Sequence, residues 1–96
     1  AAVVKDRGVW GIAVDGRAWP TRFEMAWDPV IAASGSVAAK VEVDGAYTYA
    51  VDGRVWAERF DELFAPVFDP DGNKLLVRGV QGHEAVRQVV PLDQIR

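Results

Sequence analysis

The clearest candidates for chemistry in this sequence are Asp69, Asp71 and Asn73, whose side-chain oxygens lie at alternate positions. This spacing opens calcium-binding loops of the EF-hand type, which also require glycine at position 6 and glutamate at position 12. Here those two positions are Lys74 and Val80, so the calcium pattern fails. Because Pro-Asp-Gly is typical of tight turns, we expect a turn in this segment and no metal site.

The single histidine, His83, is a second candidate. A zinc site would need further histidine or cysteine ligands, and the chain has neither. The sequence leaves open a catalytic pair of His83 with a nucleophile. Since His83 follows a turn glycine, Gly82, we expect it at the surface or on a sheet edge.

An acidic cluster beside Arg59 consists of Glu58, Asp61 and Glu62. Paired carboxylates hydrolyse glycosidic bonds in many enzymes. The corresponding stretch of an earlier repeat, 21–25, does not carry the cluster, so we expect a solvated loop that could also serve as a docking patch. No phosphate loop, dinucleotide fingerprint or nucleophile elbow occurs. We therefore expect no catalytic, cofactor-binding or metal-binding residue, and no enzyme.

The composition is that of a folded protein rich in β-structure. The 96 residues include 11 basic and 14 acidic side chains, for a net charge of −3, and 50% of them are hydrophobic. These values argue against disorder and against nucleic-acid binding. No apolar run is long enough to cross a membrane, and no cysteine is present. The chain opens at Ala1 without an initiator methionine or a signal-peptide pattern, which suggests a fragment or a processed chain.

An internal repeat of 37 residues organises the sequence. The run Ala-Val-Asp-Gly-Arg-x-Trp-x-x-Arg-Phe occurs at 13–23 and again at 50–60. We divide the single unit 1–96 into repeats 8–44 and 45–81 and a partial third copy, 82–96. Recurring aromatic residues predict the repeat core: Trp10, Trp19, Trp27, Tyr47, Trp56 and Phe64.

Short apolar runs between Asp-Gly pairs predict an antiparallel meander, because Asp-Gly supplies the positive φ angles of two-residue hairpin turns. The turn residues are Asp15, Gly16, Asp44, Gly45, Asp52, Gly53, Asp71 and Gly72, with weaker turns at Ser34-Gly35 and Gln81-Gly82. The expected strands are 9–14, 17–20, 29–33, 37–43, 46–51, 54–57, 66–69, 75–80 and 83–90. We expect no helix longer than about two turns.

Alternation within these strands places large side chains on one face and small ones on the other. In 46–51 the large face carries Tyr47 and Tyr49, and the small face carries Thr48 and Ala50. Since neither face is strongly polar, we expect sheets that are covered on both faces. A one-residue gap after Ser36 aligns Lys40 with Arg78, and an extra residue near Asp44 restores the frame.

The segment Pro66-Val67-Phe68-Asp69-Pro70-Asp71-Gly72-Asn73-Lys74-Leu75 resembles the blade motif of WD-like and TolB-type β-propellers. The repeated Val-Asp-Gly-Arg-x-Trp element (14–19 and 51–56) is similar to the tryptophan-rich TmcD family. Those proteins are cofactor-free, WD-like subunits of the Tmc transmembrane electron-transfer complex. The resemblance implies antiparallel blades, about two and a half per chain, and a cytoplasmic location beside a membrane complex. A small β-sandwich or barrel is the alternative fold.

From the repeat pattern and this resemblance, we expect a non-catalytic interaction scaffold without a cofactor. The alternative is a lectin-like propeller that binds carbohydrate or a small ligand, which needs exposed tryptophans at equivalent places. We expect Trp19 and Trp56 to be largely buried in equivalent environments instead.

Two and a half blades cannot close a ring. About 400 Å² of apolar surface left open on each outer face forfeits on the order of 10 kcal/mol. The partners are therefore the remaining blades of a longer chain, protein subunits, or copies of this chain in a homo-oligomer. We expect the interface at the first and last strands, 1–5 and 83–90.

Overall fold

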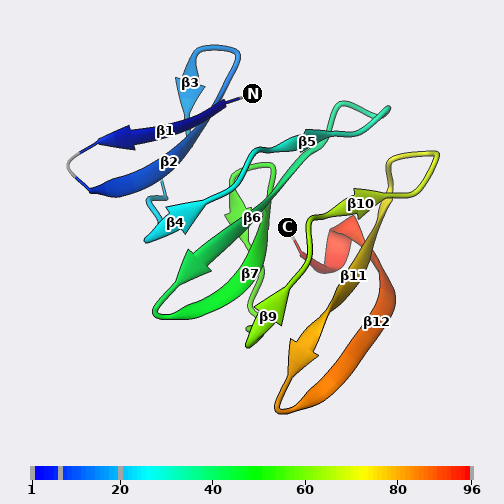
Figure 1. The fold of residues 1–96 in the computed structure, drawn as a ribbon. Helices are drawn as coiled ribbons and strands as arrows, with labels where there is room; N and C mark the ends of the chain where they lie inside the picture. Colours follow the sequence, from blue (N-terminus) through cyan, green and yellow to red (C-terminus); the bar gives the residue numbers. More distant parts are fainter. Residues whose placement is uncertain (1, 7, 20, 96) are drawn as a thin grey trace.

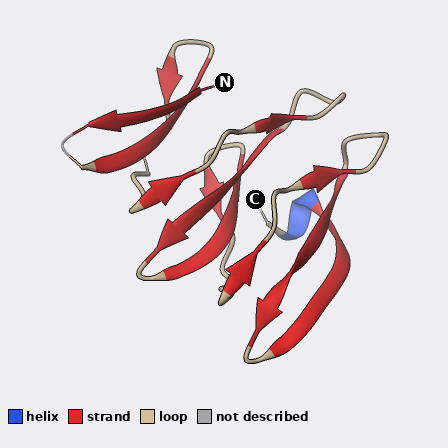
Figure 2. Ribbon diagram, in the orientation of Figure 1, coloured by secondary structure: helices blue, strands red, loops and turns tan. Residues whose placement is uncertain are grey.

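The chain forms an all-β structure of antiparallel strands. The structure is a computed structural model that describes residues 2–6, 8–19 and 21–95. Within this part of the chain, twelve strands and one 3-10 turn, η1 (Leu92–Gln94), make up the regular elements (Figures 1 and 2). The coarser part of the predicted fold class, an all-β structure of antiparallel strands, is confirmed for the described residues.

The strands form three separate sheets that follow one another in chain order (Figure 1). The first sheet contains β1 (Ala2–Asp6), β2 (Val9–Val14) and β3 (Arg17–Ala18). The middle sheet contains β4 (Met25–Ala26), β5 (Val30–Ile31), β6 (Val37–Val43), β7 (Ala46–Val51) and β8 (Arg54–Val55). The third sheet contains β9 (Glu62–Leu63), β10 (Val67–Phe68), β11 (Lys74–Gln81) and β12 (Glu84–Pro91).

The middle sheet is covered on both faces by its neighbours. One face contributes Ala39, Val41 and Ala50 to a core shared with the first sheet. The other contributes Tyr49, Val51 and Trp56, among others, to a core shared with the third sheet. The three sheets therefore form an open stack packed face to face, and none of them closes. This packing fits the sandwich alternative at the level of neighbouring sheets.

Strand predictions are accurate where the alternation is long. The strands expected at 9–14, 37–43 and 46–51 are β2, β6 and β7 with the same bounds. The other expected strands overlap observed ones, with ends that differ by one to two residues. The nine ranges omit β4 and β9, because their pairing with β6 and β11 depends on contacts distant in sequence. The first strand expected at 1–5 is β1, and residue 1 lies outside the described part.

Asp-Gly chemistry forms the tight hairpins at three places. Both residues have positive φ at Asp15-Gly16, Asp44-Gly45 and Asp52-Gly53. The fourth pair differs, since only Gly72 has positive φ there. Gly72 lies in a longer loop between β10 and β11, closed by a hydrogen bond from Asp69 N to Lys74 O (3.0 Å).

The strand registers agree with a one-residue gap in the alignment of the repeats. Met25 pairs with Glu42, whereas its counterpart Glu62 pairs with Val80, one position farther than a 37-residue shift would give. The prediction that the frame is restored near Asp44 is wrong. The last hairpin turns at Gly82-His83, with φ of 58° and 70°, so the offset persists through β12.

Candidate interaction surfaces

Trp56 is the best-buried tryptophan of the repeat, with 7% of its surface exposed. Its ring is stacked on Tyr49 (centroids 6.5 Å apart, planes at 4°) and lies 5.7 Å from the Phe60 ring. The side chain is part of the core between the middle and third sheets. It is therefore a packing residue, because its ring is enclosed among core side chains.

Trp19, at the corresponding position of the earlier repeat, is only half-buried. Its indole ring lies over Gly53, with Cδ1 3.7 Å from the place that a Cβ on that glycine would occupy. Trp19 and the half-buried Trp10 pack against the edge of the core between the first and middle sheets. The prediction that Trp19 and Trp56 lie in equivalent, largely buried environments is therefore wrong, because Trp19 is less buried than Trp56.

Trp27 and Phe64 are the second aromatic pair of the repeat. Trp27 contacts Tyr47 edge to face (5.8 Å), and Lys40 Nζ lies 4.3 Å from its ring centroid. The Arg78 guanidinium lies 5.7 Å from the Phe64 ring, and 58% of the surface of Phe64 is exposed. The prediction that Phe64 is a core residue is wrong, because no described sheet covers the outer face of the third sheet.

Tyr49 connects the middle sheet to the third one. Its hydroxyl donates a 2.7 Å hydrogen bond to the carbonyl of Phe64, at the gap between β9 and β10. Burial raises the pKa of Tyr49 from 10.0 to about 12, and the backbone and charge of Arg78 oppose that rise. The phenol therefore stays neutral and serves as a donor between sheets.

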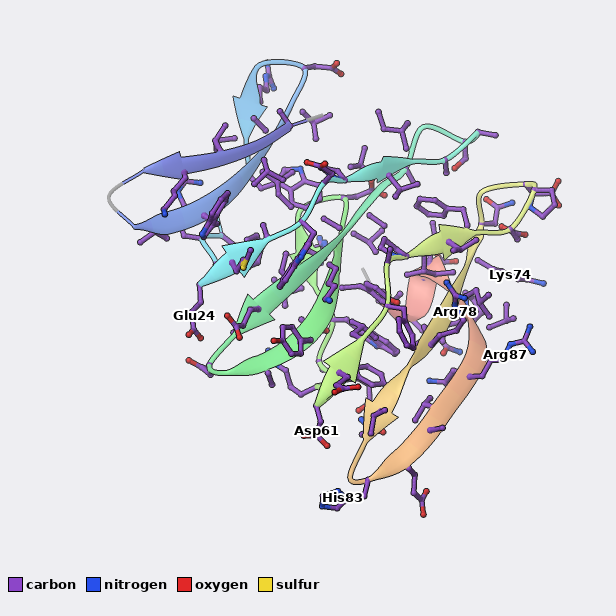
Figure 3. The ribbon with its side chains drawn as sticks, in the orientation of Figure 1. Glu24, Asp61, Lys74, Arg78, His83 and Arg87 are labelled. Atoms are coloured by element: carbon purple, nitrogen blue, oxygen red, sulfur yellow. The ribbon has the colours of Figure 1, made fainter. Side chains whose placement is uncertain are left out.

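The outer face of the third sheet combines arginines with exposed apolar side chains. Arg78 and Arg87 lie directly opposite each other on β11 and β12, and Leu76 and Val89 form the next pair along the same face. Val89 is 60% exposed. Figure 3 shows Lys74, Arg78 and Arg87 together on this sheet. Opposed like charges are unfavourable in an isolated sheet, so an anionic neighbour would stabilise this face.

The outer face of the first sheet is small and apolar. Val4 and Val9 are 41% and 40% exposed. Next to them lies Gly11, which is covered by the side chain of Arg22, whose Nη1 donates to Trp19 O (2.9 Å). This face and that of the third sheet are the two outward surfaces of the stack.

The remaining candidates from the sequence lie in turns. Asp69 Oδ1 accepts hydrogen bonds from Asn73 N and Lys74 N, both 2.9 Å, as a turn residue does. The Lys74 amide, followed by those of Asn73 and Gly72, holds the pKa of Asp69 below its usual value. His83 is exposed at the tip of the last hairpin (Figure 3).

Within the acidic cluster, the side chain of Asp61 makes a hydrogen bond to the last hairpin turn. Asp61 Oδ2 accepts from Gly82 N (3.0 Å), and Glu58 and Glu62 are exposed. Arg59 Nη1 donates to Trp56 O, the same contact that Arg22 makes one repeat earlier. The described residues include no group of three or more acidic, histidine or cysteine side chains that could hold a metal ion.

Sequence reasoning did not identify Arg78 and Arg87 as surface residues. The alignment of Lys40 with Arg78 was the available signal, because it placed a cation at the same point of two successive sheets. The sequence carried no such signal for Arg87, because only the register of β11 and β12 places it opposite Arg78.

Comparisons with known proteins give no relative for this chain. No protein-family model, no curated protein and no solved structure matches it. No pocket opens among the described residues, and none of their helices is long and apolar enough to span a membrane.

Proposed function

We propose that this chain is a non-catalytic interaction scaffold built from propeller-type sheets. One observation carries the proposal: the middle sheet is covered on both faces, whereas the outer sheets leave apolar faces open. Val41 and Ala50 of the middle sheet are completely buried against the first sheet. Their counterparts 37 residues earlier are Val4, which is 41% exposed, and Ala13, which is half-buried.

The first sheet thus presents outward the same kind of face that the middle sheet buries. In blade-like repeats each sheet contacts only its neighbours, and terminal faces need a further partner. The partners under this proposal are further blades, copies of the chain, or protein subunits. The resemblance to the TmcD family adds a membrane-associated electron-transfer complex as one class of partner.

The burial of Trp56 favours the scaffold over the lectin-like alternative. Ligand sites at equivalent positions would need both Trp19 and Trp56 at the surface, and Trp56 is 7% exposed. Among the described residues, the aromatic side chain classed as exposed is that of Phe64, which lies beside Arg78 on an outer face.

Light scattering and thermal melting over a dilution series test the scaffold. We expect a particle heavier than the 10.5 kDa chain, with a melting temperature that falls on dilution because folding and association are linked. Val4→Lys and Val89→Lys, one on each outer face, should shift the particle towards smaller mass. Ile31→Lys is the control, because Ile31 is 59% exposed but lies in the middle sheet. A concentration-independent melt that neither outer variant changes would contradict the proposal.

A further inference from the structure

The strand β1 lacks the neighbour that its two counterparts have. In the middle sheet, β6 pairs with β7 on one edge and with β4 and β5 on the other. In the third sheet, β11 pairs in the same way with β12 and with β9 and β10. In the first sheet, β1 pairs with β2 alone and is the terminal strand of the described part of that sheet.

The unused backbone groups of β1 can be assigned from these counterparts. Lys40 O and Glu42 O of β6 accept hydrogen bonds from Trp27 N (3.0 Å) and Glu24 N (3.1 Å). Arg78 O and Val80 O of β11 accept from Phe64 N (2.9 Å) and Asp61 N (2.8 Å).

Val3 and Lys5 hold the matching positions of β1. They pair with Ile12 and Trp10 just as Lys40 and Glu42 pair with Tyr49 and Tyr47. Because hydrogen-bonding direction alternates along an antiparallel strand, the amide groups of Val3 and Lys5 face the open edge.

The two segments that fill the equivalent edges share one pattern. They are residues 24–31 and 61–68. In order, both contain an acidic residue, any residue, Ala or Leu, an aromatic residue, any residue, Pro, Val, and at the last position Ile or Phe. The Ala or Leu is an inward anchor, since Ala26 and Leu63 are 4% and 3% exposed. The acidic residue reaches the hairpin turn of its own sheet: Glu24 Oε1 accepts from Gly45 N (2.9 Å), and Asp61 Oδ2 from Gly82 N.

The first sheet offers matching groups for the acidic and the aromatic residue of a third segment of this kind. Gly8, with φ of 81°, corresponds to Gly45, because Gly8 lies in the turn after β1 and Gly45 in the turn after β6. Trp10 corresponds to Tyr47, which Trp27 contacts edge to face, and Lys5 Nζ lies 5.2 Å from the Trp10 ring. An incoming aromatic side chain would therefore meet Trp10 and Val3, and an incoming carboxylate would meet the Gly8 amide.

We propose that the open edge of β1 binds an extended segment with this acidic–x–(Ala/Leu)–aromatic–x–Pro–Val–apolar pattern, which completes the first sheet as an added antiparallel strand. The inference rests on the proposed scaffold function and names the partner's chemistry. A folded second copy cannot donate the segment, because its own 24–31 and 61–68 already fill the middle and third sheets. The donor is a chain segment outside residues 1–96.

A labelled peptide of residues 61–68, Asp-Glu-Leu-Phe-Ala-Pro-Val-Phe, is the probe. Fluorescence anisotropy on the whole 96-residue chain should show saturable binding, and a scrambled peptide of the same composition should bind at least about tenfold more weakly. Replacing the peptide's Asp61 with Asn should also weaken binding, because the charged acceptor for the turn amide is lost.

Two variants of the chain locate the site. Lys5→Pro removes the amide donor on the open edge, and we expect about a tenfold loss of affinity. Lys5→Ala is the matched control, since it keeps the amide and should bind within a few-fold of the parent. Hydrogen exchange on the parent chain gives a second readout that does not depend on the folding of a variant. The peptide should protect the amides of Val3 and Lys5.

The inference is overturned if the peptide does not bind, if the scrambled peptide binds equally well, or if protection appears without Val3 and Lys5. Such a result leaves the scaffold intact when Val4→Lys and Val89→Lys still change the mass of the particle. If those variants also have no effect, the scaffold itself is contradicted.

Discussion

The two spaces between the sheets are lined by corresponding residues but differ in how well they are filled. Between the first and middle sheets, the core contains Ile12 and Phe23, with Trp19 half-buried at its margin. Between the middle and third sheets, the counterparts are Tyr49, Phe60 and Trp56, all buried. The same sequence motif therefore gives two degrees of burial.

The C-terminal turn adds two buried side chains to the core between the middle and third sheets. Leu92 and Ile95, in and just after η1, are 2% and 7% exposed and belong to the second core. The turn is tied to the loop before β11 by a hydrogen bond from Leu92 N to Asn73 O (3.0 Å). Burial of a repeated tryptophan thus depends on what covers it, and variants at corresponding positions should have unequal effects.

The largest inequality is expected at the two tryptophans. Trp56→Ala should lower the free energy of unfolding by about 3–5 kcal/mol, the usual range for a large aromatic side chain removed from a core. Trp19→Ala should cost about 1–2 kcal/mol, because less apolar surface leaves the interior. Denaturant melts of both variants against the parent measure the difference. Equal losses would show that the two spaces are filled alike.

Two loop glycines give a second matched pair. Gly72 and Gly35 both have positive φ, but a Cβ on Gly72 would lie 2.6 Å from Ser34 Oγ and 2.9 Å from Ala32 Cβ. A Cβ on Gly35 would meet nothing within 4 Å. Gly72→Ala should therefore cost about 3 kcal/mol, and Gly35→Ala about 1 kcal/mol, the backbone penalty alone. A Gly72→Ala variant no less stable than Gly35→Ala would contradict the contact between the two loops.

Tyr49→Phe isolates the hydrogen bond that joins the middle and third sheets. Loss of the donor to Phe64 O should cost about 1–2 kcal/mol near neutral pH. Since the folded pKa of about 12 lies above the unfolded value of 10.0, Tyr49 contributes stability below pH 10 that is lost as pH rises towards 12. The alkaline loss should be smaller in Tyr49→Phe than in the parent. Equal alkaline profiles would show that Tyr49 does not titrate in this way.

The smallest effect is expected at Asp69. Its folded pKa lies below the usual 3.8, so its contribution is present above that value and is lost as pH falls through the folded pKa. Asp69→Asn should reduce the acid sensitivity of the melting temperature and leave stability at neutral pH little changed. If Asp69→Asn left the acid sensitivity of the melting temperature unchanged, the result would mean that the amides of Asn73 and Lys74 do not hold the carboxylate.

The sequence predicts the hairpins well because their information is local. Asp-Gly pairs set positive φ at the turns, and alternation over six or more residues defined β2, β6 and β7. The two-residue strands β4 and β9 escaped prediction, because their pairing with β6 and β11 depends on contacts distant in sequence.

The surfaces were harder to predict, since exposure depends on which sheet lies outside. Trp27 and Phe64 hold the same place in the repeat, yet Trp27 is half-buried beside Tyr47 and Lys40, whereas Phe64 is 58% exposed on an outer face. Likewise, Arg87 gains significance only when the register sets it opposite Arg78.

Amide hydrogen exchange along the three sheets tests most directly the claim that the middle sheet is covered and the outer ones are open. The account predicts the slowest exchange in β6 and β7, at residues such as Val41, Tyr49 and Ala50, which are completely buried. The amides of Val3 and Lys5 on the open edge of β1 should exchange fastest among the strand residues. Protection at β1 equal to or greater than that at β6 and β7, in the absence of any added peptide, would contradict it.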